Sequence, residues 1–86
     1  MSDSPSTTAK APTVVDLRPM FPAERHTTVF AALESLEPGA TFVLMNDHAP
    51  VPLLQRIAQN WPDQFESEFL ADGPEVWQVA ITRKNA

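Results

Sequence analysis

The chain has 86 residues, 43% hydrophobic and 20% charged, which is an ordinary globular composition with room for one domain and one modest core. Six Lys and Arg residues are scattered among eleven Asp and Glu residues, giving a net charge of −5, so we expect no nucleic-acid binding. There is no cysteine, which excludes disulfides, thiol catalysis, iron–sulfur clusters and cysteine-based zinc sites.

The N-terminal segment, residues 1–11, is rich in Ser, Thr and Pro and has no apolar periodicity. We expect a disordered tail there and a single domain over residues 12–86. The tail lacks the apolar core of a signal peptide, and the longest apolar run, residues 42–45, is too short to cross a bilayer. We therefore expect a cytoplasmic protein that makes no membrane contact.

The first half of the domain predicts a strand, a helix and a second strand. Residues 13–18 are rich in β-branched side chains, as a strand is. Residues 22–36 carry a helical apolar stripe, Val29, Phe30, Leu33 and Leu36, and a proline at the first position. A turn containing Gly39 ends this helix, and residues 41–45 then form a continuous apolar run that indicates a central strand.

The second half predicts a short helix and a hairpin. After a polar turn, residues 46–50, a helix follows over residues 52–61, with Leu53, Leu54, Ile57 and Trp61 on one face. Residues 64–70 alternate, which predicts that Phe65, Ser67 and Phe69 face the core. A Gly-Pro turn joins this strand to a last strand over residues 75–83.

The element order is therefore βαβαββ. This order predicts an α/β (α+β) fold: a two-layer sandwich of a four-stranded mixed sheet with both helices on one face. The opposite face of the sheet is expected to be exposed to solvent and is a candidate partner surface, carrying Glu66, Glu68, Gln78 and Thr82.

Across residues 13–84 this order resembles the small sulfur-carrier family of TusA and SirA. In that family an aspartate in the first strand precedes a Cys-Pro-x-Pro motif at the start of the first helix, and a Pro-Gly pair follows the helix. Asp16 and the pair at residues 38–39 occupy matching places. The position of the family's cysteine falls on Pro22, and residues 23–25 read Ala-Glu-Arg. We therefore expect the carrier fold without persulfide transfer.

The chain is more similar to an uncharacterised bacterial family called Domain of Unknown Function twenty-two forty-nine, which looks like a cysteine-less relative of the sulfur carriers. The similarity rests on residues 16–18 (Asp-Leu-Arg), 24–26 (Glu-Arg-His), 46–53 (Asn-Asp-His-Ala-Pro-Val-Pro-Leu) and 73–77 (Gly-Pro-Glu-Val-Trp). The resemblance implies a bacterial cytoplasmic protein, sometimes found beside hemerythrin-like or nitrogen-oxide-related proteins. It implies no known reaction.

These polar segments are expected to meet at the carboxyl edge of the sheet, where strand-to-helix loops and helix N-termini gather. The resembling fold runs its last strand antiparallel to the others, which brings residues 72–75 to the same edge. We expect an accessory module, not an enzyme, that binds a protein partner or a small anionic ligand there. The candidate residues are Arg18, Glu24, Arg25, His26, Asp47, His48 and Glu75.

Two alternative functions use the histidines. His26 and His48 could ligate a metal or serve a haem-related role in the respiratory or nitrogen-oxide metabolism that the resemblance implies. Their spacing matches no metal motif, so we expect no cofactor. Alternatively, His48 acts as the general base of a small enzyme and Asp47 orients it. Nothing in the sequence pairs a nucleophile with a base or forms a phosphate-binding glycine loop, which favours binding over catalysis.

Several of these residues also have plain structural interpretations. Asn46 or Asp47 is expected to cap the second helix or to form the turn before it, and Trp77 to be a core residue next to the carboxyl edge of the sheet. The oligomeric state does not follow from the sequence. Arg18 and Arg25 are expected to form ion pairs with nearby carboxylates, namely Asp16, Glu24 or Glu75.

Overall fold

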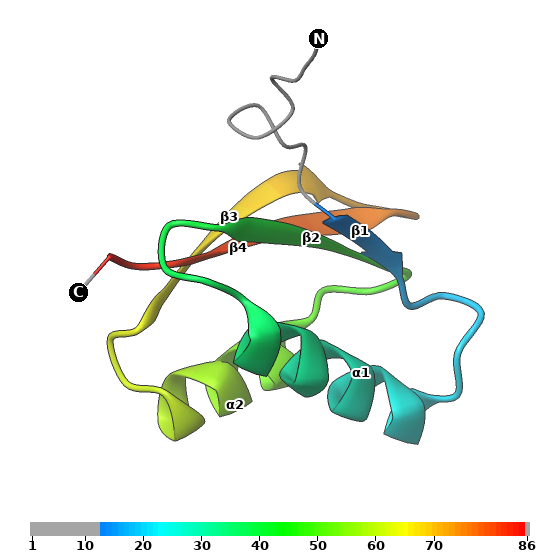
Figure 1. Cartoon of the computed structure of the whole chain (residues 1–86). Helices are drawn as coiled ribbons and strands as arrows, with labels where there is room; N and C mark the ends of the chain where they lie inside the picture. Colours follow the sequence, from blue (N-terminus) through cyan, green and yellow to red (C-terminus); the bar gives the residue numbers. More distant parts are fainter. Residues whose placement is uncertain (1–12, 86) are drawn as a thin grey trace, which may run out of the picture.

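The computed structural model, which describes residues 13–85, has two helices packed on one face of a four-stranded sheet (Figure 1). Its elements follow the predicted βαβαββ order, and the expected N-terminal tail lies outside the described residues. The elements are β1 (Thr13–Asp16), α1 (Pro22–Ser35), β2 (Thr41–Asn46), α2 (Val51–Asn60), β3 (Phe65–Asp72) and β4 (Trp77–Arg83). Neither helix of the described chain is long and apolar enough to cross a bilayer.

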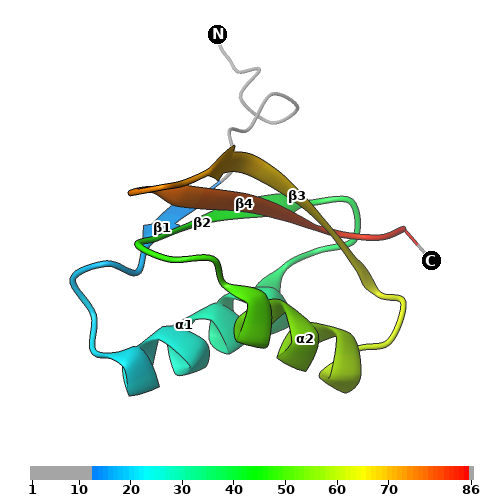
Figure 2. The same cartoon turned by 180° about the vertical axis from the view of Figure 1, so that it is seen from behind.

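The sheet is mixed, as predicted, with the strand order β1-β2-β4-β3. β1 runs parallel to β2, whereas β4 is antiparallel to both of its neighbours, β2 and β3. Asn46, at the end of β2, pairs with Trp77, at the start of β4. The carboxyl end of β2 therefore shares one edge of the sheet with the β3–β4 turn, and the view from behind shows both helices beneath the same face (Figure 2).

The core lies between the two central strands and the two helices. Phe42 and Leu44 of β2 pair with Ile81 and Val79 of β4, and all four side chains are buried. Each fully buried aliphatic or aromatic side chain contributes about 1.5–3 kcal/mol to stability. The helices and the loop after β1 complete this core with Leu17, Val29, Leu33, Leu53 and Ile57.

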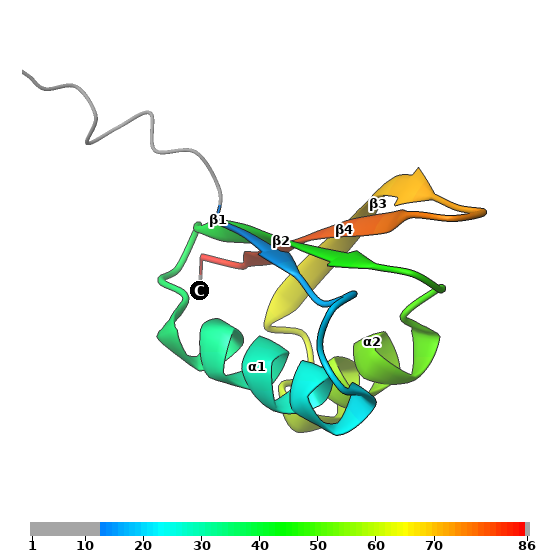
Figure 3. The ribbon, with the colours of Figure 1, turned by 90° about the vertical axis from the view of Figure 1, so that its right-hand side faces the viewer.

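Phe65, Ser67 and Phe69 lie on the helix-facing side of β3, as predicted, because Ser67 and Phe69 pair with the buried residues Ile81 and Val79. Only Phe65 packs against the core; Ser67 is exposed and Phe69 is 43% exposed, so the helices do not cover this part of the face. The physical reason is that the helices cover the central strands, whereas β3 lies at the edge of the sheet and its hairpin reaches away from both helices (Figure 3). Alternation predicted which face each residue lies on, and the coverage of that face depends on elements distant in sequence.

Trp77 does not lie in the core, so that prediction was wrong. The residue is half-buried, and its ring packs edge-to-face against Phe69 with the centroids 6.2 Å apart. It also covers Gly73, where an added Cβ would lie 2.5 Å from the indole ring. Gly73 adopts φ +92°, and its N–H donates to the carbonyl of Val76 at 2.9 Å. Trp77 therefore packs within the hairpin, over its turn.

Candidate functional site

A small cleft opens where the two helices begin and β2 ends. Its volume is about 80 Å³, and we call it the rim cleft. It brings together three of the candidate residues predicted from the sequence, Arg25, His26 and His48. Its lining consists of Pro22, Arg25, His26, Asn46, His48, Pro50, Pro52 and Leu53.

Arg25 joins the β1–α1 loop to the end of β2. Its Nε donates to the carbonyl of Met20 at 3.1 Å, and its Nη2 donates to the carbonyl of Arg18 at 3.1 Å. Its Nη1 donates to Oδ1 of Asn46 at 2.8 Å and to Oδ1 of Asp47 at 3.1 Å. The side chain is only 12% exposed. Because every guanidinium nitrogen already has an internal acceptor, Arg25 builds the wall of the cleft and has little capacity left for a ligand.

Asn46 and Asp47 do not cap α2, contrary to expectation. The N-cap residue is Pro50, which makes no side-chain cap hydrogen bond. Asn46 is the last residue of β2 instead of the first residue of a turn, and it is buried at 3% exposure. The long side chain of Arg25 extends from α1 and donates hydrogen bonds to the side-chain oxygens of both residues. These are the oxygens that were predicted to accept hydrogen bonds from backbone N–H groups of α2.

Asp47 is ionised at neutral pH and lies at the same edge. It accepts hydrogen bonds from Arg25 and from Nδ1 of His48, the latter at 2.8 Å. These bonds, with that from Arg25 the stronger influence, lower the pKa of Asp47 from 3.8 to about 2. The expected ion pair of Arg25 therefore exists, but its partner is Asp47 and neither Glu24 nor Glu75.

The two histidines line the rim cleft in different ways. His48 is 64% exposed, and the ionised carboxylate of Asp47 requires a proton on Nδ1, so that Nε2 is the ring nitrogen not used by Asp47. His26, on α1, is half-buried with its ring centroid 6.1 Å from that of Phe30. No hydrogen bond links the His26 ring to another part of residues 13–85. Both imidazoles thus offer ring nitrogens to an incoming group.

Arg18 lies at the same edge but is paired as expected. Its Nε and Nη2 donate to the two carboxylate oxygens of Asp16 at 2.9 and 2.8 Å, and its backbone N–H donates to Oδ1 at 3.0 Å. The pKa of Asp16 is about 2 as a result, and that of Arg18 is raised. The Arg18 side chain does not line the rim cleft; its carbonyl contributes by accepting from Arg25.

Glu24 and Glu75 are not brought into the cleft. Glu24 is exposed on the first turn of α1 and borders a shallow, open hollow formed with Met20, Ala23, Thr27 and Thr28. Glu75 is exposed in the turn before β4, at the predicted edge of the sheet but outside the cleft lining. The polar segments therefore share one edge of the sheet, but only residues 24–26 and 46–53 contribute to the lining of the rim cleft.

Val51 is an exposed apolar residue at this edge whose exposure was not predicted from the sequence. Phe21, the N-cap of α1, is 75% exposed, and Val51, the first residue of α2, is 49% exposed. Each is bonded directly to a proline that lines the rim cleft. Val51 gave no signal because it lies between the predicted polar turn, residues 46–50, and the predicted helix, residues 52–61.

The geometry offers little to a metal ion. Within residues 13–85, no three His, Asp or Glu side chains gather closely enough to hold one. The rim cleft contributes two imidazoles, and the carboxylate of Asp47 is already engaged by Arg25.

Residues 14–83 match the family described as Uncharacterized conserved protein (DUF2249). The chain belongs to this family. Membership confirms the family resemblance that the four short polar segments indicated. The description of DUF2249 states no activity, so membership adds none to the rim cleft.

The fold of this DUF2249 chain is similar to the solution structure of HP1264 from Helicobacter pylori, with a TM-score of 0.66. The two chains are 16% identical, and the match covers 86% of this chain and 99% of HP1264. At that identity the likeness concerns the fold alone. None of the curated proteins matches the sequence. The likeness to TusA and SirA stays a prediction.

Proposed function

We propose that this protein is an accessory module, without catalytic chemistry of its own, that binds a partner protein at the rim cleft. The observation that carries the proposal is a cleft of about 80 Å³ with two available imidazoles, bordered by exposed apolar side chains. Pockets for drug-sized ligands measure about 300–1,000 Å³, so this cleft is the size of one protein side chain.

The chemistry of the cleft favours an acidic side chain. Both helices begin at the cleft, and neither N-cap residue, Phe21 or Pro50, covers its helix end with a side-chain hydrogen bond. Helix N-termini carry partial positive charge, and an imidazole protonated on both nitrogens is a cation that donates to carboxylates. Since Nδ1 of His48 already donates to Asp47, His48 donates from Nε2 to a partner carboxylate only in that doubly protonated form. Arg25 is neutralised by Asp47, so the attraction comes from His26, His48 and the helix ends. Phe21 and Val51 supply the apolar surface that a partner would bury around this contact.

Site-specific photo-crosslinking in the native host tests the proposal. A photoreactive phenylalanine in place of Phe21 should capture a defined protein, and His26→Ala with His48→Ala should abolish the capture. The matched control places the same group at Glu34, an exposed residue in the last turns of α1. The captured protein, once purified, should bind the wild-type chain directly and the double variant at least tenfold more weakly. Equal capture from both positions, or capture that ignores the histidines, would contradict the proposal.

One contact favours a second function, general-base catalysis. The Nδ1 of His48 lies 2.8 Å from a carboxylate that Arg25 keeps ionised, which is how enzymes orient an imidazole base. No Ser or Thr side chain lines the rim cleft, so His48 would have to activate water or act on the substrate directly.

Hydrolysis of an activated ester such as p-nitrophenyl acetate distinguishes the two functions. A binding module should accelerate this reaction no more than an equal concentration of free imidazole. Acceleration at least tenfold above imidazole, lost in both His48→Ala and Asp47→Asn, would establish catalysis and remove the accessory role. The Asp47→Asn variant is the informative control, because it retains the imidazole and removes the carboxylate that orients it.

A further inference from the structure

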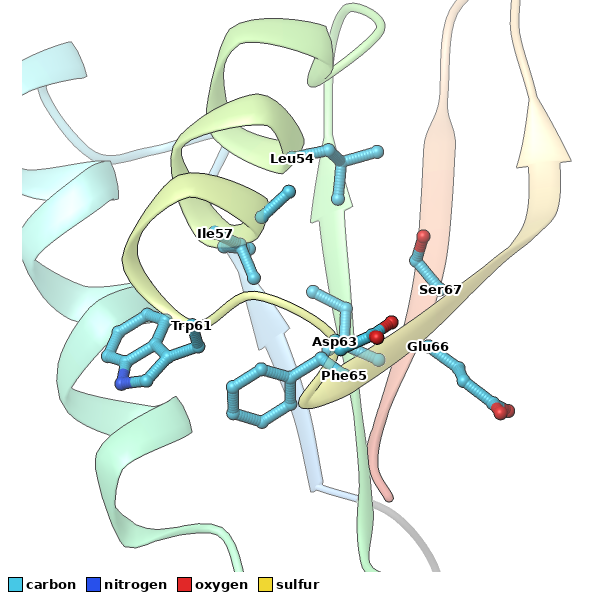
Figure 4. A pocket seen from close by; sticks show the side chains of 9 residues that line it. Leu54, Ile57, Trp61, Asp63, Phe65, Glu66 and Ser67 are labelled. Carbon is cyan, nitrogen blue, oxygen red and sulfur yellow. The ribbon is translucent and has the colours of Figure 1, made fainter.

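A second cleft lies along the other side of α2, facing β3 (Figure 4). It measures about 220 Å³ and shares no lining residue with the rim cleft. Leu54, Ile57 and Trp61 line it from the helix side, and Phe65, Ser67 and Ile81 line it from the sheet. We call it the β3 cleft. Asp63, Glu66 and Ser67 are the polar members of its lining, and the remaining lining residues are apolar, so the cleft offers an apolar contact to an aliphatic or aromatic side chain.

Ser67 is the reason that the β3 cleft stays open. It lies on the helix-facing side of β3, paired with the buried residue Ile81 of β4. A large apolar residue at this position would fill the space beside α2. The small hydroxyl side chain instead leaves the floor of the cleft uncovered, next to Phe65 and Ile57.

The outer edge of β3 is available for pairing. β3 hydrogen-bonds to β4 on one side and is the last strand of the sheet formed by the described residues. Residues 66–70 are all exposed, and the ladder with β4 is regular from Phe65 to Phe69, before an irregularity between Phe69 and Ala71. An edge strand of this kind presents unpaired N–H and C=O groups to a segment from another chain.

The charge of the edge selects among possible partners. Glu66 and Glu68 lie on the face away from the helices, alternating with Ser67. Asp63 precedes the strand and lines the β3 cleft, and β3 itself carries no basic residue. A second copy of this chain pairing through β3 would oppose these carboxylates with carboxylates, which is destabilising. A strand with basic residues on that face would pair favourably.

We propose that β3 accepts an extended segment of another protein as a fifth strand. The segment places Lys or Arg beside Glu66 and Glu68 on one face and an apolar side chain in the β3 cleft on the other. Main-chain hydrogen bonds supply affinity in this mode of recognition, and alternate side chains supply specificity. The site is separate from the rim cleft, so a partner at one surface leaves the other free.

Amide NMR spectra of the full chain, titrated with the capped peptide Lys-Leu-Lys-Leu-Lys, test the proposal. Shifts should concentrate in β3 and in residues 54–61, which comprise most of α2 and its C-cap. Replacing the lysines by glutamates should weaken binding at least tenfold. Two N-methylated peptides provide the backbone control, one methylated at the lysines and the other at the leucines. Because alternate residues point their N–H groups to the same edge, one of the two should lose binding and the other should keep it.

Two protein variants complete the test. Glu66→Lys with Glu68→Lys changes only exposed positions and should reverse the preference, so that the glutamate peptide binds more tightly. Ser67→Leu should fill the β3 cleft and weaken the lysine peptide at least tenfold while the protein stays folded. Equal binding of both methylated peptides, shifts centred on the rim cleft, or a preference unchanged by the charge reversal would each overturn the proposal.

Discussion

Arg25 fixes the geometry of the rim cleft because a single guanidinium reaches three segments of chain. It contacts the carbonyls of Arg18 and Met20 in one loop and the side chains of Asn46 and Asp47 at the end of β2. Lysine carries the same charge but cannot donate in this planar, forked arrangement. The identity of the residue therefore matters beyond its charge.

We expect Arg25→Lys to lower the free energy of unfolding by about 1–3 kcal/mol, because the buried oxygen of Asn46 loses its donor. Urea denaturation measures this loss. The matched control is Arg18→Lys, which alters an exposed ion pair and should change stability by less than about 1 kcal/mol. Equal effects at both positions would show that Arg25 does not organise the edge.

Asp47 makes stability depend on pH in a defined window. Its pKa is about 2 in the folded chain against 3.8 for the free side chain, so the folded form binds the proton less readily. The contribution of ionised Asp47 to the free energy of unfolding is therefore present in full above pH 4, and it is lost as the pH falls through 2. Asp16 contributes in the same window. Thermal unfolding between pH 2 and 5 should therefore show a shallower loss of Tm for Asp47→Asn than for the wild type. An identical slope would contradict the assignment.

At the scale of elements, the helices and strands could be predicted because their signals are local. Prolines, apolar stripes and alternation occur within one segment, and the predicted bounds differ from the observed ones by about two residues. Contacts between segments carry no such signal. Asn46 accepts a hydrogen bond from Arg25, which is distant in sequence, and Phe69 is exposed because no distant element covers it. Trp77 packs on Gly73 because of the geometry of the turn between them.

The β3–β4 turn offers a prediction at this scale. Gly73→Ala should cost more stability than Gly39→Ala, although both glycines have positive φ angles, +92° and +83°. The strain of such a conformation is of order 1–3 kcal/mol for either alanine. At Gly73 the new Cβ also meets the Trp77 ring at 2.5 Å, whereas at Gly39 it meets the end of the Asn85 side chain at 3.1 Å. Urea denaturation of the two variants compares them, and equal losses would mean that Trp77 does not hold the turn.

At the scale of the whole molecule, one short helix borders both candidate binding surfaces. The start of α2 lines the rim cleft, and the rest of the helix lines the β3 cleft. The fold itself was predictable because βαβαββ order and patterning permit few arrangements. The two proposed binding surfaces were predictable only in part. The sequence indicated that Arg25, His26 and His48 gather at one edge, but the size of the rim cleft and the uncovered side of β3 depend on packing between segments distant in sequence.

Binding of an acidic side chain in the rim cleft can be measured on the two histidine rings. Histidine-ring NMR spectra of the full chain are titrated with N-acetyl-glutamate amide, and N-acetyl-glutamine amide is the matched neutral probe. We expect the ring signals of His26 and His48 to shift together and saturate with the acid while the amide leaves them unchanged. Equal shifts with both probes, or shifts only outside the rim cleft, would contradict it.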